Sequence, residues 1–173
     1  MNVSFHIRPE HAGDESAIRA VNLGAFDSPD EAALVDDLRQ RSDPFISLVA
    51  CNNDQVVGHI SFSPLAIRDQ DQTHSAIALA PLAVLPAFQR QGIGGQLVRA
   101  GLDACRAAGY EIVIVLGHPN YYPRFRFERA SLYDIRWEHE APDEAFMVTA
   151  LKPGALEGIK GIVSYHPAFD RFS

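Results

Sequence analysis

Apolar and polar residues follow two different periods along the chain, and these periods predict the order of its strands and helices. Alternation over residues 3–7 predicts a first strand. Apolar residues at three- and four-residue spacing predict a helix over residues 11–26, with Asp14 as its N-cap. A second helix is expected after Ser28, which would cap it, with Glu31 as the acid of a capping box. The chain is therefore expected to open with a strand and two helices.

The next part of the chain has the pattern of consecutive antiparallel strands. Apolar runs over residues 45–51 and 56–65 flank residues 52–55, whose sequence Asn-Asn-Asp-Gln is typical of a hairpin turn. Residues 75–84 predict a further strand, but Pro81 within it has no amide hydrogen to donate to a neighbouring strand. We therefore expect this strand to bulge or to separate from its neighbour there.

A helix and a buried strand come next, and with the preceding strand they form a βαβ unit. Apolar residues recur at helical spacing from Ile93 to Cys105, and the helix is expected to end near Gly109. Residues 112–116 are apolar throughout, which is typical of a strand buried on both faces. This order of strand, helix and strand predicts a parallel crossover.

The C-terminal part is expected to complete one domain. Strands are predicted around residues 135–137 and 145–151, whereas the remainder is irregular in pattern but apolar. A chain of 173 residues with 47% hydrophobic content supports one core and is too short for two ordinary domains. We therefore expect a single domain over residues 1–173, with a core of about 3–151 and a tail, 152–173, that packs on the body and covers the acceptor site.

Charge and cysteine content argue against several classes of protein. The net charge is −7 and the basic residues are scattered, which argues against nucleic-acid binding. Cys51 and Cys105 are expected to be reduced and buried, and no C-x-x-C or H-x-x-H spacing indicates a metal site. No leader pattern and no long apolar run is present, so we expect a cytoplasmic protein without a membrane span.

The strongest functional signal is the stretch from Gln89 to Gly95, Gln-Arg-Gln-Gly-Ile-Gly-Gly, between a strand and a helix. The first amides of a helix lack carbonyl partners and the helix dipole is positive there, so main chain alone can bind a diphosphate. Gly92 and Gly94 would let the ligand approach, and Arg90 could add a charged hydrogen bond. The spacing matches neither a P-loop nor a dinucleotide-binding motif.

These residues resemble the acetyl-CoA signature of the GNAT superfamily of N-acetyltransferases. The matching parts are residues 82–86, Leu-Ala-Val-x-Pro, then 89–94, Gln-x-x-Gly-x-Gly, the strand 112–116 and the aromatic segment 121–127. The resemblance implies an α+β fold with a central mixed, mostly antiparallel sheet of six to seven strands, splayed at strands 4 and 5, with helices on both faces.

The same resemblance implies the cosubstrate, the acceptor and the residues that bind the coenzyme. Acetyl-CoA would be the acetyl donor, a primary amine of a small molecule or peptide the acceptor, and the protein a monomer or homodimer. The pantetheine arm would lie between the strands 75–84 and 112–116. The expected coenzyme-binding residues are Leu82, Ala83, Val84, Gln89, Arg90, Gln91, Gly92, Ile93, Gly94 and Gly95.

Transfer of an acetyl group from sulfur to nitrogen requires a neutral amine, a polarised carbonyl and a proton for the departing thiolate. The resemblance assigns the general acid to Tyr122, although Arg126 stands where the family has glycine. Arg124 or Arg126 is expected to tune this phenol. Backbone amides freed by the bulge at residues 82–84 are expected to polarise the carbonyl.

The general base is harder to place. Many members of the superfamily carry a carboxylate on the strand that corresponds to residues 75–84, and this chain has none there. Glu31 is the first candidate, and His59, His118 or a chain of waters are the alternatives.

Two other functions fit parts of the pattern. A CoA-binding or acyl-CoA-sensing domain would keep the glycine loop and lack the chemistry. A thiol or serine hydrolase could use Cys51 or Ser63 with His59, but the G-x-S-x-G motif is absent.

Overall fold

A computed structural model describes residues 4–172, so Val3 of the first expected strand lies outside the described residues. The helices of the fold lie where apolar residues have helical spacing, and they are α1 (Glu15–Ala25), α2 (Asp30–Arg41) and α3 (Ile93–Ala107). The strands are β1 (Phe5–Pro9), β2 (Ile46–Asn52), β3 (Gln55–Asp69), β4 (Gln72–Val84), β5 (Ile112–Leu116), β6 (Glu128–Arg129), β7 (Ile135–Trp137), β8 (Phe146–Ala150) and β9 (Gly161–Ser164). Short 3-10 turns lie at Pro86–Phe88, Tyr122–Phe125, Ala130–Tyr133, Asp143–Ala145 and Pro167–Phe172.

The strands form one mixed, mostly antiparallel sheet, which confirms the predicted fold class. Its main path runs β1-β2-β3-β4-β5-β8-β6, with parallel pairing between β4 and β5, and β9 pairs with both β3 and β7. Within residues 4–172 the sheet has nine strands, more than the six to seven expected. The additional strands, β6 and β9, are short. Strand β9 belongs to the tail, where glycines interrupt the apolar pattern, and it was not predicted.

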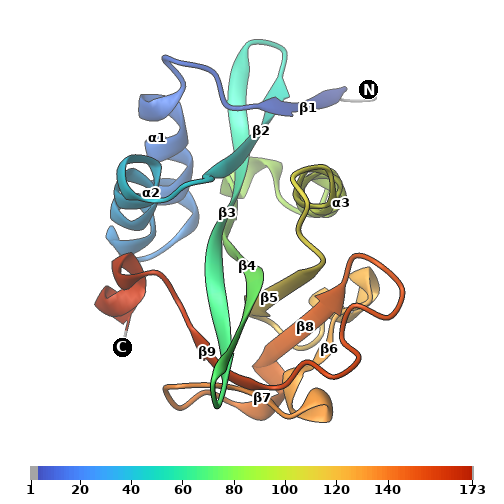
Figure 1. Cartoon of the computed structure of the whole chain (residues 1–173). Coiled ribbons are helices and arrows are strands. Elements are labelled where there is room, and N and C mark those ends of the chain that lie inside the picture. The colour runs from blue at the N-terminus through green and yellow to red at the C-terminus, as the bar shows by residue number, and fades with distance from the viewer. Residues whose placement is uncertain (1–3, 173) are drawn as a thin grey trace.

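Helices cover both faces of the sheet: α3 lies on one face, and α1 and α2 lie on the other (Figure 1). Side chains alternate between these faces along β2, as the two-residue period of a strand requires. Leu48 and Ala50 join the core under α3, whereas Val49 and Cys51 join the cluster under α1. The helices thus fix the sheet from two sides and leave the ends of β4 and β5 as the region for a site.

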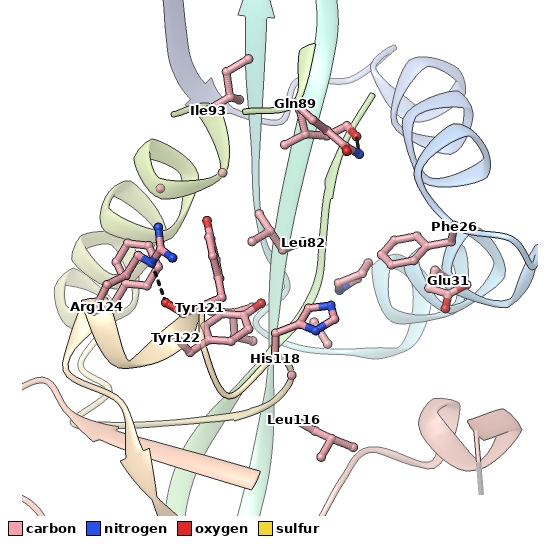
Figure 2. Close-up of a pocket in the computed structure, with 18 of the residues that line it drawn as sticks. Phe26, Glu31, Leu82, Gln89, Ile93, Leu116, His118, Tyr121, Tyr122 and Arg124 are labelled. Atoms are coloured by element: carbon pink, nitrogen blue, oxygen red, sulfur yellow. Dashed lines mark hydrogen bonds between the residues drawn. The ribbon is translucent and has the colours of Figure 1, made fainter. Parts of the chain in front are cut away.

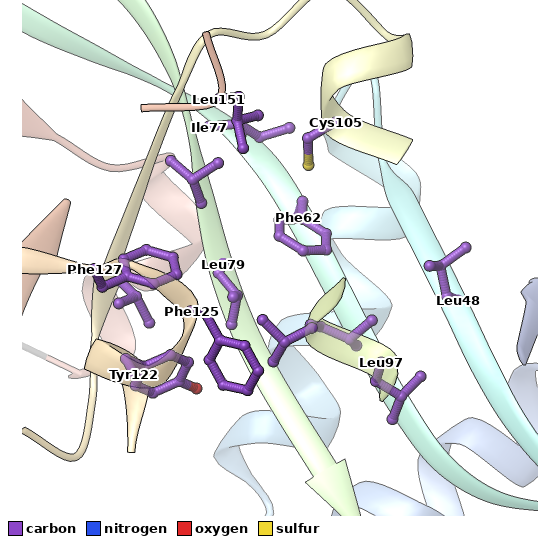
Figure 3. Packing of buried hydrophobic residues seen from close by; sticks show 14 of the residues in the cluster. Leu48, Phe62, Ile77, Leu79, Leu97, Cys105, Tyr122, Phe125, Phe127 and Leu151 are labelled. Atoms are coloured by element: carbon purple, nitrogen blue, oxygen red, sulfur yellow. The ribbon is translucent and has the colours of Figure 1, made fainter. Parts of the chain in front are cut away.

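Helix α3 lies very close to the sheet because a glycine faces β3. A Cβ built on Gly101 would stand 2.4 Å from Cε2 of Phe62, whose side chain is fully buried near the centre of this cluster (Figure 3). The close approach holds the N-terminus of α3 beside the ends of β4 and β5.

Strands β4 and β5 separate after only two paired positions, Ile77 with Val113 and Ala78 with Ile114. Beyond them β4 has a bulge, because Ile60 pairs with Leu82 whereas Phe62 pairs with Leu79. The hydroxyl of Ser61 donates a hydrogen bond of 2.8 Å to the carbonyl of Ala80 inside this irregularity. The predicted bulge and the predicted splay are therefore both confirmed.

A buried polar network joins the first two helices to β2 and β3. The amide of Asn22 donates to Nδ1 of His59 over 3.2 Å, and Nε2 of His59 lies 2.9 Å from the hydroxyl of Ser47. Ser47 donates in turn to Glu10, which accepts two hydrogen bonds of 2.9 Å from Arg39. Burial, and then the charge of Arg39, lower the pKa of His59 to about 3, so the ring is neutral.

Neither of the first two helices has the side-chain N-cap hydrogen bond that the sequence predicts. Asp14 stands at the N-cap position of α1, but its carboxylate binds Arg8 and the amide of His11 instead of capping. Ser28 accepts a hydrogen bond from the amide of Asp30, but Pro29 rather than Ser28 stands at the N-cap position of α2. Oε2 of Glu31 is buried without a hydrogen-bond partner in residues 4–172, so the expected capping box is not formed.

The C-terminal tail is part of the fold rather than an irregular cover. Its strand β9 extends the sheet beside β3, and the last 3-10 turn packs on α2 (Figure 1). Ala168 is buried with Leu34 and Leu38, and Arg171 forms an ion pair with Asp37. The tail is thereby held against the helix that carries Glu31.

Candidate active site

A cavity of about 980 Å³ opens where β4 and β5 separate. The N-terminus of α3 and the ends of β4 and β5 form one part of its wall, and α1, α2 and the tail form the other. Figure 2 shows labelled side chains of β4, of the segment after β5 and of α2, among them Leu82, His118 and Glu31, pointing toward a common space. A volume of this size accommodates a small ligand or the reactive arm of a larger one.

The glycine cluster leaves amides of α3 accessible at this cavity. Gly92 is exposed in the left-handed region at φ 84°, with no atom within 4 Å of the place where a Cβ would stand. The first backbone hydrogen bond of the helix runs from Gln96 to the carbonyl of Gly92. The amides of Ile93, Gly94 and Gly95 precede that bond and lie at the positive end of the helix dipole, where an anion is favoured. Gly94 and Gly95 are partly exposed there, whereas Ile93 is buried.

The structure places most of the predicted coenzyme-binding residues at this cavity. Two do not line it: Gln91 points to solvent, and the side chain of Ala83 is buried under α1. Ile93 lies at the cavity wall but is 1% exposed as a whole residue, and its side chain belongs to the core under α3. The residues that do line the cavity are Leu82, Val84, Gln89, Arg90, Gly92, Ile93, Gly94 and Gly95.

Gln89 has a positioning contact that the motif alone did not indicate. Its side-chain amide donates a hydrogen bond of 2.9 Å to the carbonyl of Val84, drawn as a dashed line in Figure 2. The bond joins the start of the glycine loop to the end of β4. It therefore fixes the loop relative to the slot between β4 and β5.

Three arginines line the same end of the cavity, and two of them were not predicted as coenzyme-binding residues. They are Arg90, Arg99 and Arg124, and none forms an ion pair within residues 4–172. Arg99 stacks on Phe125 at 5.2 Å and Arg124 on Tyr121 at 4.6 Å. Unpaired guanidinium groups beside free helix amides make this end of the cavity suitable for phosphates. The sequence offered one signal for Arg99, which lies one helical turn after Gly95 in α3.

Tyr121 and Tyr122 occupy different positions in the cavity. The hydroxyl of Tyr121 lies 2.8 Å from the place where a Cβ on Gly94 would stand, so it faces the start of α3. The ring of Tyr122 packs on Gly117, and its hydroxyl points into the cavity (Figure 2). Tyr121 therefore lies near the start of α3, and Tyr122 lies nearer the middle of the cavity.

The expectation that Arg124 or Arg126 tunes Tyr122 is wrong. Arg124 stacks on Tyr121, and Arg126 is exposed away from the cavity. Burial raises the pKa of Tyr122 well above its usual value, with a smaller contribution from Tyr121. Arg124 and Arg99 act instead on Tyr121, where they oppose the pKa increase that burial causes. Tyr122 thus keeps its proton in the free protein.

Glu31 lies across the cavity from Tyr122, on the first turn of α2 (Figure 2). It is the only carboxylate that lines the cavity among residues 4–172. Of the alternative bases, His118 also lines the cavity, whereas His59 is fully buried in the polar network and does not reach it.

Burial of the candidate groups excludes the hypothesis of a thiol or serine hydrolase. Cys51 is 2% exposed, Ser63 is fully buried, and both nitrogens of His59 already have partners in Asn22 and Ser47. No substrate carbonyl reaches these groups. Among the described residues no cluster of His, Cys, Asp or Glu could hold a metal ion, and no helix is long and apolar enough to cross a membrane.

Comparison with known proteins gives consistent relatives over nearly the whole chain. The family model described as the acetyltransferase (GNAT) family matches residues 16–122. The uncharacterized N-acetyltransferase YhbS of Escherichia coli (strain K12) is 40% identical over 167 residues, which cover 96% of this chain and 99% of that protein.

Solved structures show the same fold with coenzymes bound. The crystal structure of YhbS from Escherichia coli in complex with CoA superimposes with a TM-score of 0.91 at 39% identity, covering 100% of this chain and 96% of that one. A GNAT family acetyltransferase from Brucella melitensis in complex with acetyl-CoA superimposes with a TM-score of 0.78 at 35% identity, covering 98% of this chain and 100% of that one.

Proposed function

We propose, from the premise that the chain belongs to the acetyltransferase (GNAT) family, that this N-acetyltransferase moves the acetyl group of acetyl-CoA directly to a primary amine. One observation carries the proposal: free amides and unpaired arginines lie at one end of the cavity, and a buried tyrosine hydroxyl points into its middle. The relatives from Escherichia coli and Brucella melitensis were solved with CoA and acetyl-CoA, which supports acetyl-CoA as cosubstrate.

The residues at the arginine end fit the diphosphate of the coenzyme. The amides of Ile93, Gly94 and Gly95 would donate to it, and Arg90 would add charge from the rim. A Cβ at Gly94 would fill space between the helix and Tyr121, so the glycine keeps the approach open. The coenzyme's sulfur would then be directed along β4 toward Tyr122.

The main chain of β4 supplies the polar contacts that a pantetheine arm and a thioester carbonyl need. Strand β4 pairs with β5 only as far as Ala78, and β4 residues beyond it, Leu82 and Val84 among them, line the slot. Unpaired amides at this bulge can donate to the carbonyl oxygen as it gains negative charge during attack.

The reaction forms one carbon–nitrogen bond and breaks one carbon–sulfur bond. The bound ammonium first gives a proton to the base, for which we propose Glu31. The neutral nitrogen then attacks the acetyl carbon, and the carbon–sulfur electron pair leaves on sulfur. The second nitrogen proton is lost while sulfur takes one, so the products are an N-acetylated amine, the free thiol of CoA and one proton delivered to solvent through Glu31.

Tyr122 would assist the departure of sulfur chiefly as a hydrogen-bond donor. A phenol of ordinary pKa near 10 is already a weaker acid than a thiol near 8.5, which makes full proton transfer unfavourable by about 2 kcal/mol. Burial raises the pKa of Tyr122 further, so its proton is retained until sulfur carries charge. A hydrogen bond to that charge in a dry site stabilises the transition state more than the ground state.

The substitution Tyr122→Phe tests this mechanism. We expect kcat for thiol release to fall by about tenfold or more, while the affinity for CoA stays within a few-fold of the parent. Tyr133→Phe is the matched control, because Tyr133 hydrogen-bonds Glu128 outside the cavity. Equal turnover in Tyr122→Phe and the parent would exclude Tyr122 as the donor to sulfur.

A further inference from the structure

The end of the cavity opposite the arginines is built from aromatic side chains. Phe26 follows α1, Trp137 lies on β7, and Tyr165 and Phe169 belong to the tail. Trp137 packs edge-on against Tyr165 with ring centroids 5.7 Å apart, and Tyr165 lies 5.0 Å from Phe169. Burial raises the pKa of Tyr165, so this wall presents rings and a neutral hydroxyl.

Charge in the cavity is separated between its two ends. Arg90, Arg99 and Arg124 line the end at the glycine loop, whereas Glu31 is the single carboxylate that lines the cavity within residues 4–172. A ligand with phosphates at one end and a cation at the other matches this distribution. The coenzyme accounts for the arginines, which leaves Glu31 for the second substrate.

Glu31 also has an unmet hydrogen-bonding requirement. Its Oε2 atom is buried without a partner in the described part of the chain. A buried acceptor without a donor destabilises the folded protein, the more so when the acceptor is charged. An ammonium group bound in the cavity beside this carboxylate would supply the opposite charge.

We infer that the acceptor is a monocationic arylalkylamine, whose ammonium group binds Glu31 and whose ring packs among Phe26, Tyr165 and Phe169. This inference rests on the proposed function and names its substrate class. Rings favour both a flat apolar body and a nearby cation. An α-carboxylate on the acceptor would place a second negative charge beside Glu31, and a peptide would bring backbone groups that aromatic walls leave unpaired.

Steady-state thiol release with a panel of amines tests the inference. The panel contains 2-phenylethylamine, tryptamine, n-propylamine, phenylalanine and a lysine-containing peptide. We expect kcat/KM for 2-phenylethylamine and tryptamine to exceed the values for phenylalanine and the peptide by about tenfold or more. Higher kcat/KM for phenylalanine or the peptide would overturn the substrate class and leave the transferase function intact. CoA binding by calorimetry without thiol release from any amine in the panel would overturn both.

Two variants separate the charged contact from the aromatic contact. Glu31→Gln should weaken binding of 2-phenylethylamine to the CoA-bound protein by about tenfold or more in ligand-observed NMR, with CoA affinity unchanged. Phe169→Ala should raise KM for 2-phenylethylamine but not for n-propylamine, which has no ring to place.

The matched control is Glu144→Gln, because Glu144 is exposed and does not line the cavity. Circular dichroism melting confirms that each variant is folded. Unchanged binding of 2-phenylethylamine to a folded Glu31→Gln variant would show that this carboxylate does not hold the amine. An equal rise in KM for both amines in Phe169→Ala would assign that residue a role other than ring contact.

Discussion

Gly94 stands between the free amides of α3 and the ring of Tyr121, so Gly94→Ala has effects on stability and on coenzyme binding that can be separated. The new Cβ would lie 2.8 Å from the hydroxyl oxygen of Tyr121. The ring cannot easily move, because it packs against Tyr122 at 5.1 Å, Phe125 at 5.4 Å and the guanidinium of Arg124 at 4.6 Å. An overlap of this kind costs about 1–3 kcal/mol, and alanine regains at most about 1 kcal/mol of helix propensity.

The double variant Gly94→Ala/Tyr121→Phe removes the overlap. Without the hydroxyl, the nearest ring atom, Cζ, would lie 3.8 Å from the new Cβ, which is an ordinary contact. A double-mutant cycle measured by urea unfolding should therefore give a coupling energy of about 1–3 kcal/mol, with the double variant more stable than the sum of the single changes predicts.

Coenzyme affinity should respond differently. In both Gly94→Ala proteins the Cβ occupies the approach to the free amides, so calorimetry should show CoA binding weaker by about tenfold, which corresponds to about 1.4 kcal/mol. Gln96→Ala is the control for a new alanine in α3, since Gln96 is exposed and does not line the cavity. Parent-like CoA affinity in Gly94→Ala would refute binding of CoA by the amides at the start of α3, and additive stabilities would refute the contact with Tyr121.

Two further predictions concern stability. The pKa of His59 is lowered to about 3, so between about pH 6.5 and pH 3 only the unfolded state takes up the proton. The contribution of neutral His59 to the unfolding free energy is therefore complete above about pH 6.5 and is lost as pH falls. The loss of unfolding free energy between about pH 7.5 and pH 5 should thus be about 2 kcal/mol smaller in His59→Gln than in the parent, and equal losses in urea titrations would contradict this. Gly101→Ala should destabilise by about 2 kcal/mol, because its Cβ would stand 2.4 Å from Phe62. A melting temperature equal to that of the parent would show that Phe62 can move.

Local sequence patterns predicted the main helices and strands and the position of the glycines at the start of α3. Apolar periodicity placed α3 and β5, and Pro81 indicated the irregularity in β4 that opens the slot. Gly92 and Gly94 indicated the start of α3 for two different reasons. Gly92 has a left-handed φ, which glycine adopts without strain, and a Cβ on Gly94 would overlap the hydroxyl of Tyr121. Each of these signals depends on residues close together in the chain.

The acceptor end was predicted less well, because its contacts join distant parts of the chain. Glu31 fits the spacing of a capping box, yet it lines the cavity, and Pro29 rather than Ser28 stands at the N-cap of α2. The tail becomes a strand only because β3 offers an unpaired edge at residues 66–68, which no pattern within the tail indicates. His59 has its partners in Asn22 and Ser47, which only the folded topology brings together.

The division of the cavity between two parts of the chain has a consequence for how such proteins diversify. In the proposed function the donor is received by a short loop and the helix after it, whereas the face opposite is lined by Phe26 after α1, by α2 and by the final residues. On this proposal, substitutions among the final residues would exchange one recipient molecule for another and leave the residues that hold the acyl donor unchanged.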